Sequence, residues 1–238
     1  MRTAYTVFRN LYNVRKMTMK LVLASGSQRR RELLTMCGYD YEIIVSNADE
    51  TIDENDPESF VRALSFRKAK DVFDRLFAAG RRDFAVIGSD TVVAFQKDGE
   101  AKPVIIGKPK DAEDAVRILS MLSGKTHRVF TGVSVIADIP DENADAQCSI
   151  QEKAEIQTEC SITEVTFETL SPDEITDYVN SGDPLDKAGS YGIQGPFGMF
   201  VREIRGNYFT VIGMPIPVLY KMLKKIGILP HGFYERIE

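Results

Sequence analysis

Three consecutive arginines, at positions 29–31 of the segment SQRRRELL (27–34), are the first residues that point to chemistry. The spacing of apolar residues predicts a helix over 28–37, so the arginines stand in its first turn. A helix N-terminus is already electropositive, and arginines there oppose the macrodipole. The strand, glycine-containing turn and helix start that meet at Ser27 are also a general way to hold a phosphate. The pattern favours an anion site; the alternative is a solvated basic patch whose arginines reach distant carboxylates.

Two acidic segments contain residues that can hold a metal ion or activate water. Glu50 lies in ADET (48–51) after a predicted strand, and Asp90 lies in GSDT (88–91), where strand-like sequence breaks. Mg²⁺ prefers oxygen ligands and is usually bound together with waters and substrate phosphates. A carboxylate can also orient or deprotonate an attacking water. Taken alone, each carboxylate is better explained as an Asx turn or a helix cap.

Two lysines stand near these segments. Lys68 lies on a predicted helix over 57–77, and Lys108 lies in GKP (107–109), where the proline limits backbone freedom before the next helix. An isolated lysine is usually a solvated surface residue. Either lysine therefore becomes a candidate phosphate ligand only in combination with the other segments.

The segment DKAGSYGIQG (186–195) is too rich in glycine for a regular helix or strand. Within it, Gln194 carries a side-chain acceptor and two donors, so it could read a base edge that presents both kinds of group. The alternative is a buried structural loop.

The segment SGKT (123–126) contains the end of a phosphate-binding P-loop but lacks the rest of it. The required earlier glycine would be position 119, which is Leu119, and the segment follows a helix instead of joining a strand to a helix. We therefore reject a P-loop, and we interpret the neighbouring His127 as a packed or capping residue and not as a catalyst.

The elements that must position these residues alternate between strands and helices. We predict strands at 20–24, 41–45, 84–87, 91–95, 128–137 and 161–170, helices at 28–37, 57–77, 111–122 and 215–225, and a hairpin formed by 199–204 and 208–212. Ser171 and Glu174 have the spacing of a capping box at the start of another helix. This mixture of strand–helix units and hairpins predicts an α/β fold with a mixed β-sheet and flanking helices.

Length and composition restrict the class of protein further. The 238 residues suffice for one large domain or two lobes with a common core, and 30 basic against 35 acidic side chains give a net charge of −5. A general nucleic-acid binder would usually be basic, so we expect no nucleic-acid partner. No uncharged apolar run approaches the roughly 18 residues of a membrane span, and we expect no membrane association. The three cysteines have no CxxC spacing, so the sequence argues against a disulfide framework and against a structural zinc site.

We divide the chain into three parts. Residues 1–18 form a basic N-terminal extension without acidic residues, 19–228 form the folded domain with an acidic insertion at about 138–160, and 229–238 form a C-terminal tail. A basic, acid-free leader is typical of mitochondrial targeting. A disordered extension or an upstream start codon explains it as well, and we favour the cytoplasm.

Taken in order, the motifs resemble those of the Maf (septum formation protein) family of nucleoside triphosphate pyrophosphatases. The resemblance covers about 20–223 and is carried by segments that are each weak alone but specific as an ordered set: LASGSQRRRELL (23–34), DET (49–51), RKA (67–69), GSDT (88–91), GKP (107–109), SGKTH (123–127), TGV (131–133), SYGIQG (190–195) and GMP (213–215).

The resemblance implies two lobes around a central cleft, a fold related to inosine-triphosphate pyrophosphatases, and cleavage between the α and β phosphates with Mg²⁺ or Mn²⁺. It implies that Asp90 is the proton acceptor and that Glu50 is a metal or water-positioning carboxylate, so that Glu50 and Asp90 are the candidate metal ligands. Lys108 joins them as a catalytic residue.

The resemblance also assigns the substrate-binding residues. Ser27, Arg30, Lys68 and Lys108 look like phosphate binders, whereas Arg29, Thr91 and Gln194, which precedes Gly195, fall at positions linked with base preference. The YGIQG form is similar to the branch that prefers dTTP and UTP. Two features depart from the family pattern: Gln28 replaces the usual proline, and the chain has the N-terminal extension and the acidic insertion.

The main interpretation is therefore an enzyme that hydrolyses dTTP, UTP and modified pyrimidine nucleotides to the monophosphate and pyrophosphate. The alternatives are a purine pyrophosphatase of the 7-methyl-GTP or inosine-triphosphate type, and a non-catalytic nucleotide-binding regulator of cell division. The resemblance also leads us to expect a homodimer.

Overall fold

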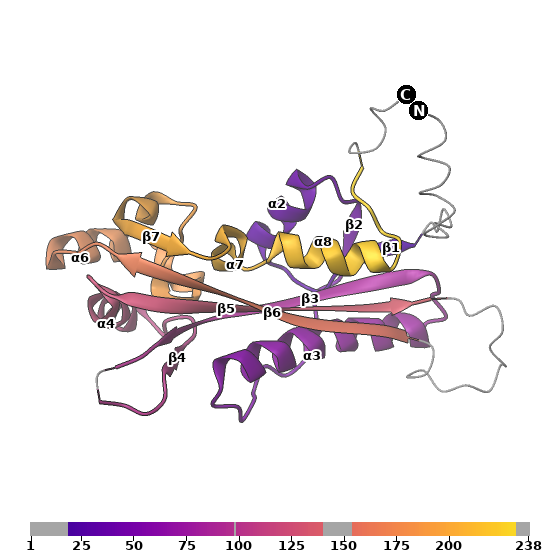
Figure 1. The fold of residues 1–238 in the computed structure, drawn as a ribbon, viewed down its shortest axis with the longest axis horizontal. Coiled ribbons are helices and arrows are strands. Elements are labelled where there is room, and N and C mark those ends of the chain that lie inside the picture. The colour runs from indigo at the N-terminus through magenta and orange to yellow at the C-terminus, as the bar shows by residue number, and fades with distance from the viewer. Residues whose placement is uncertain (1–18, 98, 140–153, 232–238) are drawn as a thin grey trace.

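The computed structural model describes residues 19–97, 99–139 and 154–231, which form a mixed seven-stranded sheet with helices on both faces (Figure 1). The strands are β1 (Lys20–Leu23), β2 (Tyr41–Ile43), β3 (Phe84–Phe95), β4 (Val104–Ile106), β5 (Thr126–Asp138), β6 (Ala154–Phe167) and β7 (Val201–Arg205). The α-helices are α2 (Gln28–Met36), α3 (Pro57–Ala78), α4 (Ala112–Leu122), α6 (Pro172–Asn180), α7 (Tyr208–Ile212) and α8 (Ile216–Lys225), and three short 3-10 helices span Asp183–Asp186, Ala188–Ser190 and Pro196–Phe200. The predicted mixed α/β fold is confirmed.

The sheet has the order β2-β1-β3-β5-β6-β7, and β4 also pairs with β3. Strand β1 is parallel to both β2 and β3, whereas the other pairs are antiparallel. The long β5–β6 hairpin forms the middle of the sheet, with β3 beside it (Figure 1).

Local sequence signals explain where three helices begin. The Asp56 carboxylate accepts from the Ser59 amide at 2.9 Å at the start of α3, and Asp111 accepts from the Asp114 amide at 2.8 Å at the start of α4. Ser171 and Glu174 form the predicted reciprocal capping box of α6. Each side chain satisfies backbone donors that have no partner within the helix.

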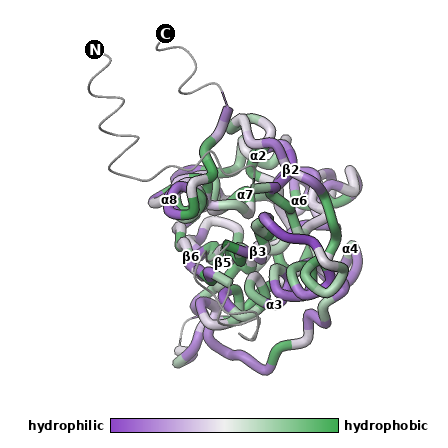
Figure 2. The backbone as a smooth tube through the Cα atoms, turned by 90° about the vertical axis from the view of Figure 1, so that its right-hand side faces the viewer, coloured by the Kyte–Doolittle hydropathy of each residue, from purple (hydrophilic) through white to green (hydrophobic). Residues whose placement is uncertain are grey.

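The two faces of the sheet carry different apolar clusters because successive strand residues point to opposite sides. Helix α3 packs on one face, against residues such as Val86 and Phe84 near its end and Val92 near its start. On the other face, α2, α7 and α8 cover Ile87 and its neighbours, while α4 and α6 cover the region around Val93. Figure 2 shows the hydrophobic central strands between α3 and α8.

Two glycines allow α3 to touch the sheet with its backbone. A Cβ on Gly88 of β3 would lie 2.1 Å from the carbonyl oxygen of Ser65, and a Cβ on Gly132 of β5 would lie 2.1 Å from that of Val61. Only residues without a side chain permit such an approach. The close contact brings the next turn of α3, which carries Lys68, directly over β3.

Among the strands that the structure describes, none pairs with the middle of one edge of β3. Strand β5 pairs with one edge along residues 85–94, so β1 and β4 must share the other edge. There β1 pairs with residues 84–87 and β4 with residues 93–95. We call the intervening residues, 88–92, the open edge of β3.

Two predictions about elements are wrong. Residues 88–91 do not break a strand: β3 is continuous, because α3 and β5 support both glycines. Residues 199–212 do not form a hairpin: β7 pairs with β6, and Asn207 then caps α7 by accepting from the Phe209 amide at 2.9 Å. An apolar five-residue segment such as YFTVI can form a strand or a helical turn, and here the cap decides.

The acidic segment predicted at about 138–160 is strand at both of its ends, since Asp138 belongs to β5 and residues 154–160 belong to β6. Residues 140–153, the extension 1–18 and most of the tail 229–238 lie outside the described residues. Among the helices that the structure describes, none is long and apolar enough to span a membrane.

Candidate active site

The open edge of β3 carries the closest group of oppositely charged side chains that the sequence singled out. Lys68 Nζ lies 2.7 Å from Asp90 Oδ1 and 2.9 Å from Glu50 Oε1. The side chains of Lys68 and Asp90 are 12% and 13% exposed, whereas Glu50 is 68% exposed. The three residues come from α3, β3 and the loop after β2, and the structure brings them together as predicted for a common site.

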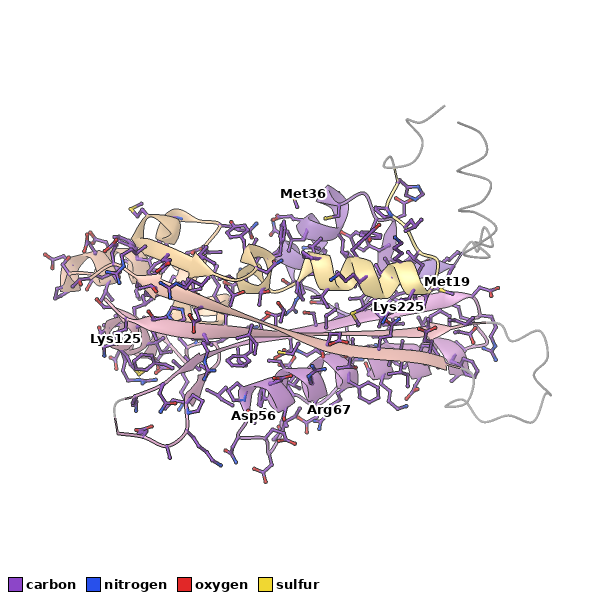
Figure 3. All side chains as sticks on the ribbon, in the orientation of Figure 1. Met19, Met36, Asp56, Arg67, Lys125 and Lys225 are labelled. Atoms are coloured by element: carbon purple, nitrogen blue, oxygen red, sulfur yellow. The ribbon has the colours of Figure 1, made fainter. Side chains whose placement is uncertain are left out.

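The loop that carries Glu50 is held against α3 by a neighbour of Lys68. Arg67, on the outer side of α3 (Figure 3), donates through Nη1 to the carbonyl oxygens of Asp49 and Thr51, each at 2.8 Å. The Asp49 carboxylate in turn accepts from the Thr51 amide at 2.9 Å. These bonds bracket Glu50 on both sides, so its carboxylate is directed at Lys68.

Arg30 approaches from the opposite face of the sheet. Its guanidinium donates to the Gly213 carbonyl at 2.9 Å, to Ser25 Oγ at 3.1 Å and to Thr91 Oγ1 at 3.5 Å. Asp90 and Thr91 are adjacent on β3, so they point to opposite faces and present their side chains to Lys68 and Arg30 respectively. The open edge therefore has a cationic group on each side.

Electrostatics reflects this arrangement. Burial lowers the pKa of the Arg30 guanidinium from its ordinary value, and the carboxylates of Asp90 and Glu50 partly offset that effect while the charge of Arg29 adds to it. A buried guanidinium that hydrogen-bonds to neutral groups is stabilised further when an anion arrives beside it.

The start of α2 offers backbone donors at the same place. Ser27 is its N-cap residue, but the Ser27 side chain caps no amide, and the first turn contains no acidic residue. The Ser27 amide donates to Ser25 Oγ at 3.2 Å, which shapes the turn after β1. A helix N-terminus with free N–H groups and no acid nearby is suited to an anion.

Lys108 is placed at the other end of the open edge by strand register. Strand β4 leaves β3 after the pair Val93–Ile106, so Lys108 follows directly where the open edge begins. Its residue is exposed, and among the described residues it makes no ion pair or hydrogen bond through its side chain. Lys108 is therefore a charged side chain with freedom to reach a ligand.

The glycine-rich loop contacts the segment after β4 and the first turn of α2. The Gly189 amide donates to the Gly107 carbonyl at 3.0 Å, and Arg29 Nη1 lies 3.3 Å from Asp186 Oδ2. Gln194 is exposed in a turn that the Gly195 amide closes on the Gly192 carbonyl at 3.1 Å. The structure thus brings the loop to the site, but within the described chain Gln194 makes no bond to Asp90 or Lys68.

A cluster of charged residues holds the beginning of that loop. Lys187 Nζ lies 2.9 Å from Asp183 Oδ1 and 2.7 Å from Asp186 Oδ1, and Tyr178 donates to Asp183 Oδ2 at 2.5 Å. Burial by itself raises the pKa of Asp183, but the hydrogen bonds from Tyr178 and Lys187 outweigh it, so that the pKa is lower than usual. Lys187 and the two aspartates, which we call the Lys187 cluster, were not identified from the sequence as a unit.

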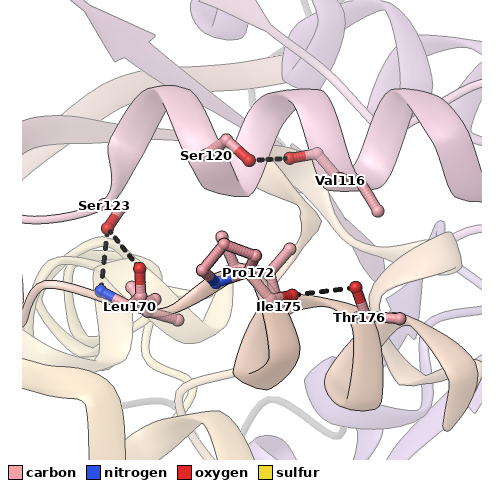
Figure 4. A pocket seen from close by; sticks show the side chains of 7 residues that line it. All are labelled: Val116, Ser120, Ser123, Leu170, Pro172, Ile175 and Thr176. Carbon is pink, nitrogen blue, oxygen red and sulfur yellow. Dashed lines mark hydrogen bonds between the residues drawn. The ribbon is translucent and has the colours of Figure 1, made fainter.

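The described cavity is elsewhere and has a different character. It measures about 240 Å³, lies between α4 and the start of α6, and is lined by Val116, Ser120, Ser123, Leu170, Pro172, Ile175 and Thr176 (Figure 4). Its hydroxyls are already bonded to nearby backbone: Ser120 donates to Val116 at 2.7 Å and Thr176 to Pro172 at 2.8 Å. We place the chemistry at the open edge instead, because the paired charges and the cationic side chains of Lys68 and Arg30 are there.

His127 is a packed residue, as predicted. It is buried, its Nε2 lies 3.0 Å from the Tyr191 hydroxyl, and its ring packs edge-on against Phe167. Burial lowers the pKa of His127 to about 3. The ring is therefore neutral at physiological pH, and it supports Tyr191 at the base of the glycine-rich loop.

A divalent cation fits the carboxylates in donor chemistry. Asp90 and Glu50 each direct an oxygen at one cationic centre, the Lys68 ammonium, and Mg²⁺ is commonly held by one or two carboxylates together with phosphates and waters. Among the described residues, no group of three or more His, Cys, Asp or Glu could hold a metal by itself. The donor set thus suits an ion that arrives with a phosphorylated ligand.

Several contributors were missed by the sequence interpretation. The Gly213 carbonyl and Ser25 hold Arg30, and Thr131 bonds to Thr91 at 3.0 Å. Gly213 has a positive φ of 108°, and a Cβ there would lie 3.1 Å from Thr91 Oγ1. A glycine before Met-Pro was a visible signal, but its partner lies 183 residues away in the chain.

Comparison with known proteins gives a consistent result. A family model described as "Maf-like protein" matches residues 20–226. A protein of Agathobacter rectalis named dTTP/UTP pyrophosphatase is 39% identical over 217 residues, covering 88% of this chain and 98% of the relative. One of the same name from Bacillus thuringiensis subsp. konkukian is 42% identical over 210 residues, covering 88% of this chain and 96% of the relative.

A structural comparison matches the Ham1 protein of Staphylococcus aureus with a TM-score of 0.42 and 15% sequence identity. The match covers 86% of this chain and 98% of the Ham1 chain.

Proposed function

Because the chain belongs to the Maf family, we propose that it is a nucleotide pyrophosphatase that hydrolyses dTTP and UTP to the monophosphate and pyrophosphate. The observation that carries the proposal is the group of Lys68, Asp90 and Glu50 at the open edge of β3, with Arg30 on the other face. The names of relatives at about 40% identity over most of the chain support the same activity.

The roles of the residues follow from what each side chain can reach. Asp90 binds Lys68 through Oδ1, and its Oδ2 has no hydrogen-bond partner among the described residues. Asp90 Oδ2 is therefore free to accept a proton from a water. That water attacks the α phosphorus, the bond from this phosphorus to the oxygen bridging the β phosphorus breaks, and pyrophosphate leaves.

The cationic groups stabilise the charge that develops on the phosphates. Lys68 lies beside Asp90, which accepts the proton of the attacking water. Arg30 and the amides of the Ser27 turn lie on the α2 side of the sheet. Lys108 lies just after the end of β4. Fixed positive groups aimed at a developing negative charge lower the barrier without reorganisation. Lys108 and Arg30 thus occupy opposite ends of the proposed triphosphate site.

We propose Mg²⁺ or Mn²⁺ as the cofactor, held by Asp90 and Glu50. When bound, such an ion neutralises phosphate charge and helps to orient water. The test is isothermal titration of the nucleotide-free chain with Mn²⁺. We expect weak binding that Glu50→Gln and Asp90→Asn both reduce, and equal binding by all three chains would contradict the assignment.

The reaction class is tested by product analysis with a panel of nucleotides in the presence of Mg²⁺. We expect dTTP and UTP to give the monophosphate and pyrophosphate faster than dCTP, CTP and unmodified purine triphosphates do. Preferred hydrolysis of 7-methyl-GTP or inosine triphosphate would instead support the purine alternative. Tight nucleotide binding without turnover would support the regulator of cell division.

Base choice is proposed to depend on Gln194. Uracil and thymine present an N3–H donor between two carbonyl acceptors, and a fixed carboxamide can accept from the former and donate to a neighbour. Cytosine offers an unprotonated N3 and an amino donor, so the same amide orientation mismatches it. An unpaired buried polar group costs about 1–3 kcal/mol, which corresponds to a factor of about 5 to 150.

The test compares kcat/KM for UTP and CTP in the parent chain and in Gln194→Glu. We expect the UTP/CTP ratio to fall, because the amide donor disappears and a negative charge enters. Gln96→Glu, an exposed amide just past β3, is the matched control and should leave the ratio unchanged. Equal ratios in the parent and in Gln194→Glu would remove Gln194 as the base reader.

We further propose that the protein works in the cytoplasm as a homodimer. The three cysteines without CxxC spacing, which argue against a disulfide framework, support a reducing compartment. Light scattering after size-exclusion chromatography should give about twice the chain mass of 26.7 kDa. A mass equal to one chain would contradict the dimer.

A further inference from the structure

The turn that carries Gln194 has few supports of its own. Gln194 is exposed, and among the described residues its side chain makes no hydrogen bond. The preceding residues Gly189 and Ser190, in the short 3-10 turn Ala188–Ser190, have positive φ values of 73° and 60°, which a regular helix or strand does not contain. The position of this turn must therefore come from anchors on neighbouring residues.

The main anchor is at Gly192, which begins the turn. The Gly192 amide donates to the Tyr178 hydroxyl at 3.1 Å, and the Gly192 carbonyl closes the turn by accepting from Gly195. The Tyr178 hydroxyl is itself oriented, because it donates to Asp183 Oδ2 at 2.5 Å. Tyr178 can do this only while the Asp183 carboxylate stays in place.

Lys187 holds that carboxylate and also lies against Gly192. Its Nζ bonds to Asp183 Oδ1 and to the Asp183 carbonyl, and its side chain is 12% exposed. A Cβ on Gly192 would lie 2.6 Å from Lys187 Cε and 2.9 Å from Lys187 Cδ. The aliphatic part of Lys187 thus fills the space that the missing side chain of Gly192 leaves.

The same lysine reaches the second element linked with base preference. Lys187 Nζ lies 2.7 Å from Asp186 Oδ1, and the other oxygen of Asp186 lies 3.3 Å from Arg29 Nη1. Arg29 is on α2, at the start of the predicted phosphate site. In the described chain, by contrast, no hydrogen bond or ion pair joins Lys187, Asp183 or Asp186 to Asp90 or Lys68.

We propose that Lys187 is a positioning residue for substrate selection: with Asp183 and Asp186 it fixes the Gln194 turn relative to Arg29, and so sets pyrimidine preference without taking part in bond cleavage. The inference rests on the proposed function. Two carboxylates and two cations balance in charge here, so removing the lysine leaves Asp183 and Asp186 facing each other without a shared cation. The repulsion between them would release both Tyr178 and the Arg29 contact.

The test is Lys187→Met, which keeps the length of the side chain and removes its charge. We expect KM for UTP to rise and the UTP/CTP ratio of kcat/KM to fall by about tenfold, with kcat for UTP changing by no more than about threefold. A loss of stability alone would lower the active fraction for both nucleotides equally and leave their ratio unchanged. Lys70→Met is the matched control, because among the described residues Lys70 pairs only with Asp74, on the outside of α3, and the change should leave the ratio as it is.

A second, milder variant keeps the test informative if Lys187→Met does not fold. Asp186→Asn removes one partner of Lys187 and the contact with Arg29 at a side chain that is 67% exposed, so the fold should survive. We expect a smaller change in the same direction, about threefold in the UTP/CTP ratio. Hydrogen exchange should also become faster at the amides of 189–195 in both variants but not in Lys70→Met.

The outcomes separate the two proposals. A parent chain that hydrolyses no nucleotide overturns the proposed function and, with it, the role in selection. A parent chain that prefers UTP, together with folded variants that keep the parental UTP/CTP ratio, overturns only the role of Lys187. A fall in kcat for UTP and CTP alike, with unchanged KM values, also contradicts it, because that result would assign Lys187 to catalysis.

Discussion

The open edge of β3 and the segment 183–195 both carry charged side chains, but the protein positions them by different means. At the open edge, Asp90 stands on a twelve-residue strand and Lys68 on a 22-residue helix, and backbone contact at Gly88 sets the distance between them. In the segment 183–195, Gln194 stands in a turn that depends on side-chain bonds from Tyr178 and Lys187. Helices and strands hold groups more precisely than loops do.

The difference suggests a division of work. In the proposed function, the rigid site acts on the triphosphate, which is the same in every nucleotide, and the loop contacts the part of the substrate that differs. Substitutions at the open edge should therefore change all substrates alike, whereas substitutions around the loop should change their ratio. The following predictions test this division.

The largest effect is expected from Asp90→Asn. The change is nearly isosteric but removes the proton acceptor and its charge, and we expect kcat to fall by about 10²- to 10⁴-fold for UTP and CTP equally. Steady-state kinetics with both nucleotides checks this, and circular dichroism and nucleotide binding should remain close to those of the parent. Near-parental turnover would assign the base elsewhere, with Glu50 as the next candidate.

Gly88→Ala should damage the rigid site through its scaffold. The new Cβ would lie 2.1 Å from the Ser65 carbonyl oxygen and 2.7 Å from the Ala69 amide nitrogen, so α3 must move away and take Lys68 with it. We expect the free energy of unfolding to fall by about 2–4 kcal/mol and turnover of every nucleotide to fall with it.

Urea denaturation measures this effect. Gly107→Ala is the control for stability, because a Cβ there meets nothing within 4 Å. If Gly88→Ala were as stable as Gly107→Ala, backbone contact would not be what holds α3 over β3.

Arg30→Ala and Lys108→Ala should separate binding from stability within the rigid site. Both should lower kcat/KM by at least about tenfold, because each loses a charge-assisted contact with phosphate of about 1.5–3 kcal/mol. Only Arg30→Ala should also destabilise the fold, since it removes the hydrogen bonds that join α2 to the Gly213 carbonyl and to Ser25.

Kinetics and thermal unfolding of the two variants check this contrast. We expect the Tm of Lys108→Ala to stay close to that of the parent, because its side chain is exposed and has no described partner. Normal hydrolysis by both variants would mean that the triphosphate binds elsewhere.

The effect that is smallest at neutral pH concerns the support of the loop, because it appears only as the pH falls. Since the pKa of His127 is about 3 in the fold against about 6.5 in the unfolded chain, the unfolded chain binds more protons between these values. The contribution of the neutral His127 to the free energy of unfolding is therefore fully present above about pH 6.5. It decreases as the pH falls towards 3, by up to about 1.4 kcal/mol per pH unit. His127→Gln should lack this contribution.

Denaturation at a series of pH values between 4 and 7 measures the slope in both chains. The difference in slope is the quantity of interest, because other groups titrate in both. The same slope in the parent and in His127→Gln would show that the histidine is not kept neutral by the fold.

Much of this protein could be predicted from the sequence because much of the signal is local. Apolar periodicity located α3, α4 and α8, and the Asp56, Asp111 and Ser171 caps are side chains that bond to amides three residues away. The arginines at the start of α2 indicated an anion site for a local reason as well, since they oppose the helix dipole of their own helix. The ordered motifs identified the family.

Local signals were misleading where a long-range contact decides. Gly88 was interpreted as a strand break, but it lies in a continuous strand because α3 passes over it. Residues 208–212 were interpreted as a strand that pairs with 199–204. They form helix α7 instead, because Asn207 caps its N-terminus, and β7 pairs with β6. A glycine or a short apolar segment is compatible with both structures until its neighbours are known.

The sequence by itself thus determined which residues are candidates for phosphate chemistry and, for Arg30 and Lys68, in which helices they stand. Only the tertiary structure decided that β1 and β4 leave five residues of one β3 edge unpaired among the described residues, and that Lys68 and Arg30 reach this edge from opposite faces. It also decided that Asp186 lies between Lys187 and Arg29. The physical reason is that strand pairing and side-chain contacts join residues far apart in the chain, Arg30 and Gly213 being 183 positions apart. Periodicity and capping report only on neighbours within a few residues.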